Sequence, residues 1–147
     1  MSDSHTPTLG FLISDLGRQL RTHFDRRVRV LGYTRAQWQA IKAIDRNEGI
    51  NQTGLAELLE VEPITLCRLM DRMEKSGQVE RRPDPDDRRA HRLFMTEQSR
   101  QSSAELSALG AVLMAEVTDG LSPEELNTLQ ALLLRLRGNL AKFGTPP

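Results

Sequence analysis

Apolar residues recur every three or four positions along most of the chain, which is the period of an amphipathic helix. The first run predicts a helix over residues 9–31, and Gly32 follows where a helix C-terminal glycine belongs. Thr34 is a suitable N-cap for a second helix over 35–46. The apolar residues of the first run are Leu9, Ile13, Leu16, Leu20, Phe24, Val28 and Leu31.

The middle of the chain predicts two closely linked helices followed by a hairpin. A break at 47–51 precedes a short helix, and a three-residue connection leads to Pro63, which suits the first turn of a longer one. Gly77 ends that helix, and two prolines and three aspartates form the loop between two short strands. The predicted bounds are 52–59 and 63–76 for the helices, and 79–82 and 92–95 for the strands.

The last part of the chain predicts two further helices. Thr96 is placed to cap the first, and Ser122 followed by Pro123 starts the second after a break at Gly120. The final helix carries a leucine stripe spaced three and four apart, for which the neighbouring chain offers too little cover. The predicted fold class is mainly α with a small β-wing: a winged helix-turn-helix domain over 33–96, and a helical dimerisation domain formed by 9–32 and 97–143.

The helix from Pro63 carries the candidate chemistry. At about 100° per residue, its four large apolar residues share one face, while Thr65, Arg68 and Arg72 lie on the opposite arc. Because a short helix and a tight turn precede it, this is the geometry of a recognition helix that enters the major groove of DNA. Arginine can bond guanine or phosphate, and a threonine hydroxyl can reach a base edge.

Charge supports this interpretation locally rather than in total. The chain holds 20 basic and 20 acidic residues, yet six arginines stand against one aspartate over 17–35, and five against three over 81–92. The hairpin loop is therefore a candidate wing that places Arg88 or Arg89 in the minor groove, whose narrow stretches attract arginine. Asp86 and Asp87 would repel phosphate if free, so we expect at least one of them to pair with an arginine and stabilise the wing.

Other classes of protein are disfavoured. No stretch approaches the roughly 18 apolar residues of a membrane span, no secretory signal is visible, and a single cysteine, Cys67, fits a reducing cytosol. The three histidines lie far apart and with Cys67 show no metal-ligand spacing. No nucleophile paired with a base, phosphate loop or acid dyad is present. We therefore expect a cytoplasmic protein that is not an enzyme and has no metal or cofactor.

The same residues resemble a known family. Residues 55–59, 65–77, 79–81 and 86–96 are similar to the winged helix of the MarR family of bacterial transcription regulators, most specifically in the Asp-Arg-Arg-Ala wing and Thr96. The block from Trp38 and the segment 120–126 resemble its SlyA-like branch. That branch carries its proline directly before the hydroxyl residue, whereas here Ile64 holds that position.

The resemblance implies a homodimer that binds a pseudo-palindromic operator through two winged helices. The predicted DNA contacts are Gln52, Thr53, Ile64, Thr65, Arg68, Arg72, Arg88, Arg89 and Arg92. The predicted dimer interface comprises Leu9, Leu12, Ile13, Leu16, Leu126, Leu129, Leu133, Leu136 and Leu140.

Because members of the family commonly sense small ligands, the resemblance also implies an effector of this protein, a small aromatic carboxylate or phenolic compound. Arg18 or Arg21 would face its carboxylate and Trp38 its ring, although Trp38 as a core residue and solvated arginines explain the same residues. A dimeric winged-helix adaptor that has lost specific DNA binding is the alternative function. The arginines at the recognition-helix and wing positions favour the regulator.

Overall fold

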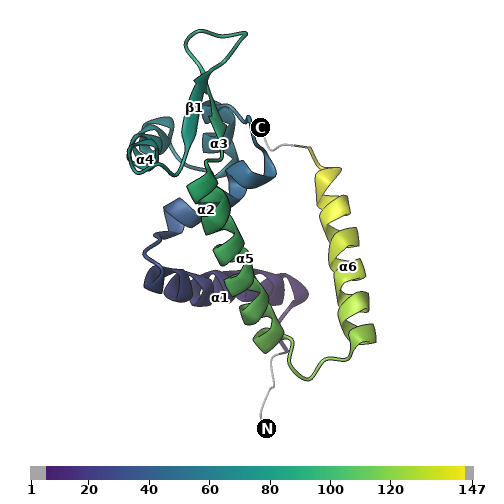
Figure 1. The fold of residues 1–147 in the computed structure, drawn as a ribbon. Coiled ribbons are helices and arrows are strands. Elements are labelled where there is room, and N and C mark those ends of the chain that lie inside the picture. The colour runs from purple at the N-terminus through teal and green to yellow at the C-terminus, as the bar shows by residue number, and fades with distance from the viewer. Residues whose placement is uncertain (1–5, 145–147) are drawn as a thin grey trace. The chain divides into compact units, whose positions relative to one another are not determined.

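The computed structural model describes residues 6–144 and contains six helices and one two-stranded sheet within that range (Figure 1). It confirms the predicted fold class, a mainly helical chain with a small β-wing. The helices are α1 (Leu9–Val30), α2 (Arg35–Arg46), α3 (Gln52–Leu58), α4 (Pro63–Lys75), α5 (Glu97–Val117) and α6 (Pro123–Ala141), and the strands are β1 (Glu80–Pro83) and β2 (His91–Phe94).

The turn between α1 and α2 forms as its sequence predicts. Gly32 has a φ of +87°, a conformation that costs glycine no steric penalty. The N–H of Tyr33 bonds the carbonyl of Val28, which satisfies a helix-end carbonyl. Thr34 and Gln37 then form a capping box at the start of α2. These local bonds set where α1 ends and α2 begins.

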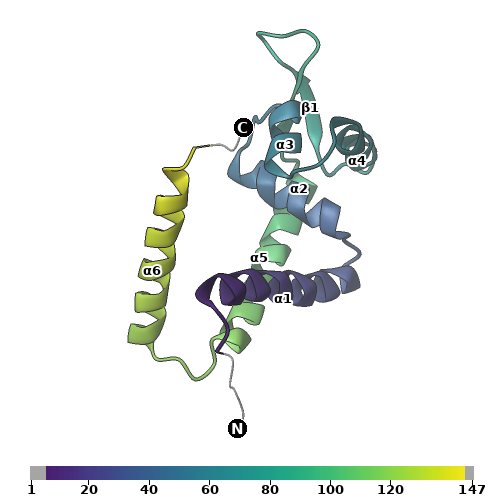
Figure 2. The same ribbon diagram turned by 180° about the vertical axis from the view of Figure 1, so that it is seen from behind.

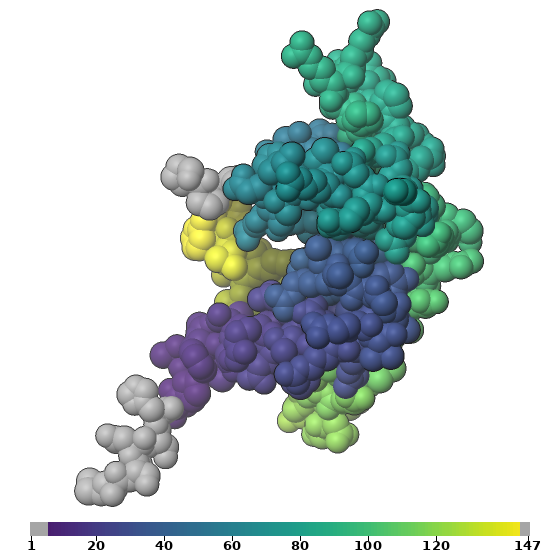
Figure 3. All heavy atoms as spheres, turned by 90° about the vertical axis from the view of Figure 1, so that its left-hand side faces the viewer, coloured from purple at the N-terminus to yellow at the C-terminus, as the bar shows by residue number. Residues whose placement is uncertain are grey.

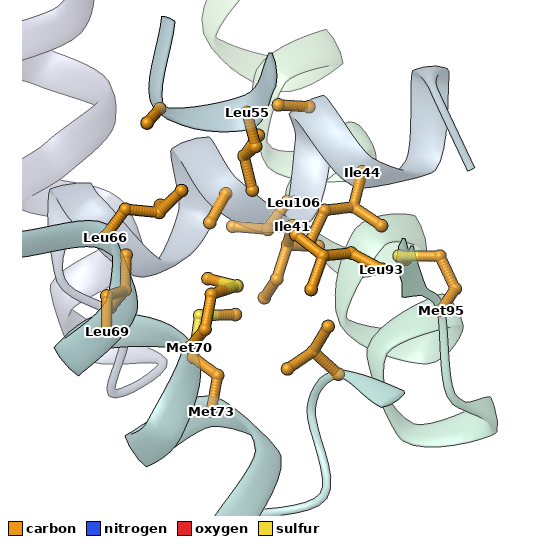
Figure 4. Close-up of a cluster of buried hydrophobic side chains, with 14 of the residues drawn as sticks. Ile41, Ile44, Leu55, Leu66, Leu69, Met70, Met73, Leu93, Met95 and Leu106 are labelled. Atoms are coloured by element: carbon orange, nitrogen blue, oxygen red, sulfur yellow. The ribbon is translucent and has the colours of Figure 1, made fainter. Parts of the chain in front are cut away.

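The core lies between α2, α3, α4 and the sheet (Figure 4). The apolar face of α4 is buried, as the helical wheel predicts, and Figure 4 shows Met70 and Met73 pointing toward Ile41 and Leu93. Burying each such side chain stabilises the fold by about 1.5–3 kcal/mol. The buried residues of α4 are Leu66, Leu69, Met70 and Met73. This packing leaves the opposite face of α4 in solvent.

The hairpin is antiparallel and lies one residue nearer its tip than predicted. Glu80 pairs with Phe94 and Pro83 with His91, so the predicted bounds 79–82 and 92–95 were wrong by one residue at each end. Just beyond the sheet, Met95 donates its N–H to the Glu48 carboxylate. At its base, Leu93 also exchanges backbone bonds with Gly49 and Ile50, which ties the wing to the chain before α3.

The contact of α5 with α2 combines the buried Leu106 with several polar side chains. Ser102 accepts a bond from the Tyr33 hydroxyl at 2.5 Å, and Lys42 donates to Ser103 at 3.1 Å and to Ser107 at 2.7 Å. Ser102 and Ser103 are buried, so each hydroxyl needs the partner that it has. Figure 2 shows α5 crossing both α1 and α2. Hydrogen bonds thus join α5 to the helices of the winged helix.

The chain forms two compact units, one ending at Ala111 and the other beginning at Val112. The first contains α1 to α4, the hairpin and most of α5, so α1 groups here with the winged helix. The predicted grouping of the terminal helices into one dimerisation domain stays a prediction. In the second unit α6 starts at the predicted Ser122, which forms a capping box with Glu125, and the helix buries none of its side chains. Over the described residues no helix is long and apolar enough to cross a membrane.

Candidate nucleic-acid interface

The outer face of α4 presents the three polar residues that the sequence singles out. Thr65, Arg68 and Arg72 are all exposed, while the residues between them, such as Leu66 and Leu69, are buried. Arg68 and Arg72 lie one helical turn apart, and neither has an ion pair among the described residues. Ile64 is 61% exposed at the start of the same helix. Because these two arginines have no anionic partner within the part of the chain that the structure describes, they are available to bind an anionic ligand such as a phosphate.

Arg81 braces α4 against the first strand, a role that sequence reasoning missed. Its guanidinium lies 2.7 Å from the carboxylate of Asp71 and 3.5 Å from that of Glu74, and it donates to the carbonyl of Cys67 at 3.1 Å. Its side chain is only 15% exposed. Although Arg81 counts toward the basic cluster over 81–92, it is committed to the fold. It fixes the angle of the recognition helix relative to the wing.

The loop end of the wing's two strands is held by Arg92 and Asp84. The Arg92 Nε donates to Asp84 at 2.9 Å, and the Arg92 guanidinium together with the backbone N–H of Asp86 holds the pKa of the Asp84 carboxyl below its usual range. Arg92 was predicted to contact DNA, and the structure gives its guanidinium this partner within the wing. Asp84 was not singled out, although an aspartate and an arginine eight positions apart on the two sides of a short hairpin loop are a usable signal.

The two aspartates predicted to stabilise the wing act in different ways. Asp87 accepts a bond from the backbone N–H of Arg89 at 2.9 Å, which shapes the tip. Asp86 lies 3.8 Å from Arg92 and is 88% exposed, so it adds little to that pair. The expected pairing of an aspartate with an arginine is made chiefly by Asp84.

The tip of the wing leaves two arginines in solvent. The side chains of Arg88 and Arg89 are exposed and form no ion pair within residues 6–144. Figure 3 shows the wing, in teal green, extending beyond the neighbouring helices of its unit. Arg82 differs, because it bonds Glu80 at 2.9 Å and lies 4.0 Å above the ring of Phe94. Of the five arginines over 81–92, only these two are left for a partner.

A small hollow joins the wing to the helix-turn-helix. Its volume is about 130 Å³, and it draws on the start of α3, the start of α4 and the wing. Two predicted DNA contacts of α3 and one of the wing thus line the same space. The lining residues are Gln52, Thr53, Pro63, Arg89, Ala90 and His91. His91 was not singled out by sequence, although it lies in the stretch 86–96 that resembles the wing of the family.

The three residues predicted to bind an aromatic acid are in different surroundings. Trp38 packs edge-on against Phe24 and donates its indole N–H to Asp25 at 2.7 Å. Arg18 is paired with Asp15 at 2.6 Å, and Arg21 is exposed. A hollow of about 470 Å³ lies at the α1–α2 turn, where Asp25 and Arg35 form an ion pair, but none of the three predicted residues lines it.

Comparison with known proteins identifies the family. Residues 33–91 match the model of the MarR family. The transcriptional regulator PA3341 is 32% identical over 92% of this chain and 99% of its own, with a TM-score of 0.76. The chain therefore belongs to the MarR family and has the winged-helix fold of its transcriptional regulators.

The chain is also similar to solved structures of two named regulators, MarR and SlyA. Wild-type MarR from E. coli in its apo form is 28% identical over 89% of this chain and 97% of its own, with a TM-score of 0.81. A MarR variant from E. coli in complex with operator DNA is 29% identical over 87% of this chain and 92% of its own, with a TM-score of 0.69. SlyA is 26% identical over 88% and 92%, with a TM-score of 0.71. These similar values place the chain in the family without assigning it to the SlyA-like branch.

Proposed function

We propose that this protein is a transcriptional regulator that binds double-stranded DNA as a homodimer. One observation carries the proposal: the face of α4 opposite its buried residues exposes Thr65, Arg68 and Arg72, beside a wing whose Arg88 and Arg89 have no partner among the described residues. A helix of this kind fits the major groove, and a basic wing fits the adjacent minor groove. The MarR complex with operator DNA supports the same use of the fold.

Each predicted contact has a distinct task in this proposal. Arg68 reads a base, Arg72 and Thr65 contact a base edge or phosphate, and Ile64 can meet a thymine methyl group. From α3, Gln52 and Thr53 contact the sugar–phosphate backbone of the DNA. Arg92 supports DNA binding indirectly: its guanidinium is held by Asp84 and stabilises the wing. In a two-fold dimer these contacts repeat about one helical turn apart, which requires a pseudo-palindromic operator.

The proposal is tested by selecting bound sequences from a random DNA pool with the purified protein. We expect a pseudo-palindromic consensus. Arg68→Ala should weaken binding to it by about 1–3 kcal/mol and relax the preference at one base of each half-site, because a bidentate base contact is lost. Arg26→Ala, which removes an exposed arginine of α1, is the matched control and should leave the consensus unchanged.

The competing function is a dimeric adaptor without specific DNA binding. Binding through phosphate contacts must weaken steeply as salt rises, since counterions are released. No enriched sequence together with a flat salt response would favour the adaptor. Equal losses for Arg68→Ala on selected and random DNA would show that Arg68 contacts phosphate only.

Binding of an aromatic acid beside Trp38 stays a prediction outside this proposal. The indole N–H is already bonded to the Asp25 carboxylate, and a second carboxylate at that place would meet like charge. Only Arg35 is paired with Asp25 among the described residues, which lowers but does not reverse that charge.

A further inference from the structure

The hollow between the wing and the helix-turn-helix lies where one strand of a bound duplex has to pass. On the proposed function, α4 occupies a major groove and the wing the adjacent minor groove. Two adjacent grooves are separated by one sugar–phosphate strand. That strand must therefore run between the start of α4 and the wing, and the hollow is bounded by Pro63 on one side and by Arg89 to His91 on the other.

The lining of the hollow suits a phosphate. Arg89 supplies a guanidinium, His91 an imidazole, Thr53 a hydroxyl and Gln52 a side-chain amide, and no carboxylate is among the six lining residues. Charged and neutral N–H and O–H donors of this kind are the usual partners of DNA phosphates. His91 is exposed, and it lies on the same face of β2 as the buried Leu93, the face turned toward the helices.

We propose that this hollow binds the backbone phosphate between the two grooves, and that protonated His91 strengthens the hold, so that DNA affinity rises as the pH falls through the neutral range. This inference rests on the proposed function. Imidazole is the side chain whose charge ordinarily changes near pH 6.5. A phosphate beside it gives the added proton a partner that the free protein lacks.

The charged side chains near His91 belong to the wing and to the start of α4. Arg89 lines the hollow together with His91. Asp84 follows Pro83, the strand partner of His91, but its carboxylate is held by Arg92, and Asp87 is bonded to the Arg89 backbone. Glu62 precedes Pro63 and is exposed. A phosphate between Arg89 and His91 can accept hydrogen bonds from both side chains.

The direction of the effect follows from linkage. An imidazole that gains a phosphate neighbour holds its proton more tightly in the complex than in the free protein. Its contribution to affinity is therefore complete at low pH and is lost as the pH rises through the value at which the complex releases the proton.

The test is the salt dependence of DNA binding at about pH 6 and pH 8 for the full-length protein. One added phosphate contact steepens the slope of log K against log salt by about 0.9. Because each protomer of the proposed homodimer adds one such contact, we expect the wild type to be steeper at the lower pH by about twice that amount. His91→Gln should show the shallow slope at both pH values, and His91→Arg the steep slope at both. His23→Gln, on the exposed surface of α1, is the matched control and should behave as the wild type.

Two results would overturn the inference while the proposed function stands: tight binding whose slope does not change with pH in the wild type, or a pH-dependent slope that survives in His91→Gln. Absence of DNA binding by the wild type at both pH values would instead reject the proposed function itself. Because His91 is exposed, both of its variants should fold, which thermal unfolding of each variant checks.

Discussion

Asp84 and Asp86 are two wing carboxylates that share one arginine but differ in their surroundings. Asp84 is 9% exposed and bonds Arg92 at 2.9 Å, whereas Asp86 is 88% exposed and lies 3.8 Å away. A nearly buried carboxylate that accepts charged and backbone hydrogen bonds has a lowered pKa, and this is found for Asp84. At the scale of single residues, Asp84 rather than Asp86 holds the wing.

This difference predicts how stability depends on pH. Because the pKa of Asp84 is lowered in the folded protein, its contribution is present above the ordinary aspartate pKa of about 3.9 and is lost as the pH falls through the lowered value. Urea unfolding should therefore show Asp84→Asn less stable than the wild type at pH 7, with the difference vanishing in acid. Asp86→Asn is the control, and an equal loss in it would contradict this assignment.

At the scale of elements, the contact between α4 and β1 decides how the recognition helix is presented. Arg81 bonds two carboxylates and one carbonyl of α4, while Arg82, the next residue, faces solvent on the other side of the hairpin. Alternation along a strand puts these neighbours on opposite faces. Arg81 therefore holds α4 against the strand, whereas Arg82 covers the ring of Phe94.

We expect Arg81→Met to lower the free energy of unfolding by about 1–2 kcal/mol, because it leaves a carbonyl and two partly exposed carboxylates without their charged donor. It should also weaken DNA binding, since α4 loses its brace to the wing. Urea unfolding and DNA titration measure the two effects. Arg82→Met is the matched control on the same strand, and equal behaviour of the two variants would show that Arg81 has no special positioning role.

At the scale of the whole molecule, both terminal helices carry apolar surface that the single chain leaves uncovered. In α1 the exposed residues include Leu9, Leu12, Ile13 and Leu16, and in α6 they include Leu129, Leu133, Leu136 and Leu140, while Leu126 is half-buried. Leu132 and Leu134, which the stripe does not include, are exposed as well. So much exposed leucine is unusual for a monomer in water and indicates a partner surface.

The protein is predicted to sediment as a stable dimer at micromolar concentration. Leu133→Glu should shift it toward monomer or aggregate, because a charge would enter the apolar contact. Gln130→Glu, an exposed position of the same helix, is the control and should leave the dimer intact. A well-folded wild-type monomer under these conditions would contradict the prediction.

Local signals in the sequence were enough to predict the helices and strands and where they end. Helix periodicity, caps at Thr34 and Ser122, Pro63 at a first turn and Gly32 after a last one are local signals, and each recurs in the structure within about one residue. The same periodicity determined which face of α4 is buried, because a face follows from spacing alone. The exposed arc with Arg68 and Arg72 was predictable for that reason.

Which arginines are available for a partner, and which side chains lie beside them, depends on how the folded chain packs. Spacing along a strand does not show that Arg81 meets Asp71 and Glu74, or that Arg92 meets Asp84, since these pairs depend on how hairpin and helix pack. The same spacing gives no sign that His91 lines one hollow with Thr53, which is distant in the sequence. Such contacts join residues distant in sequence, and packing rather than local propensity sets them.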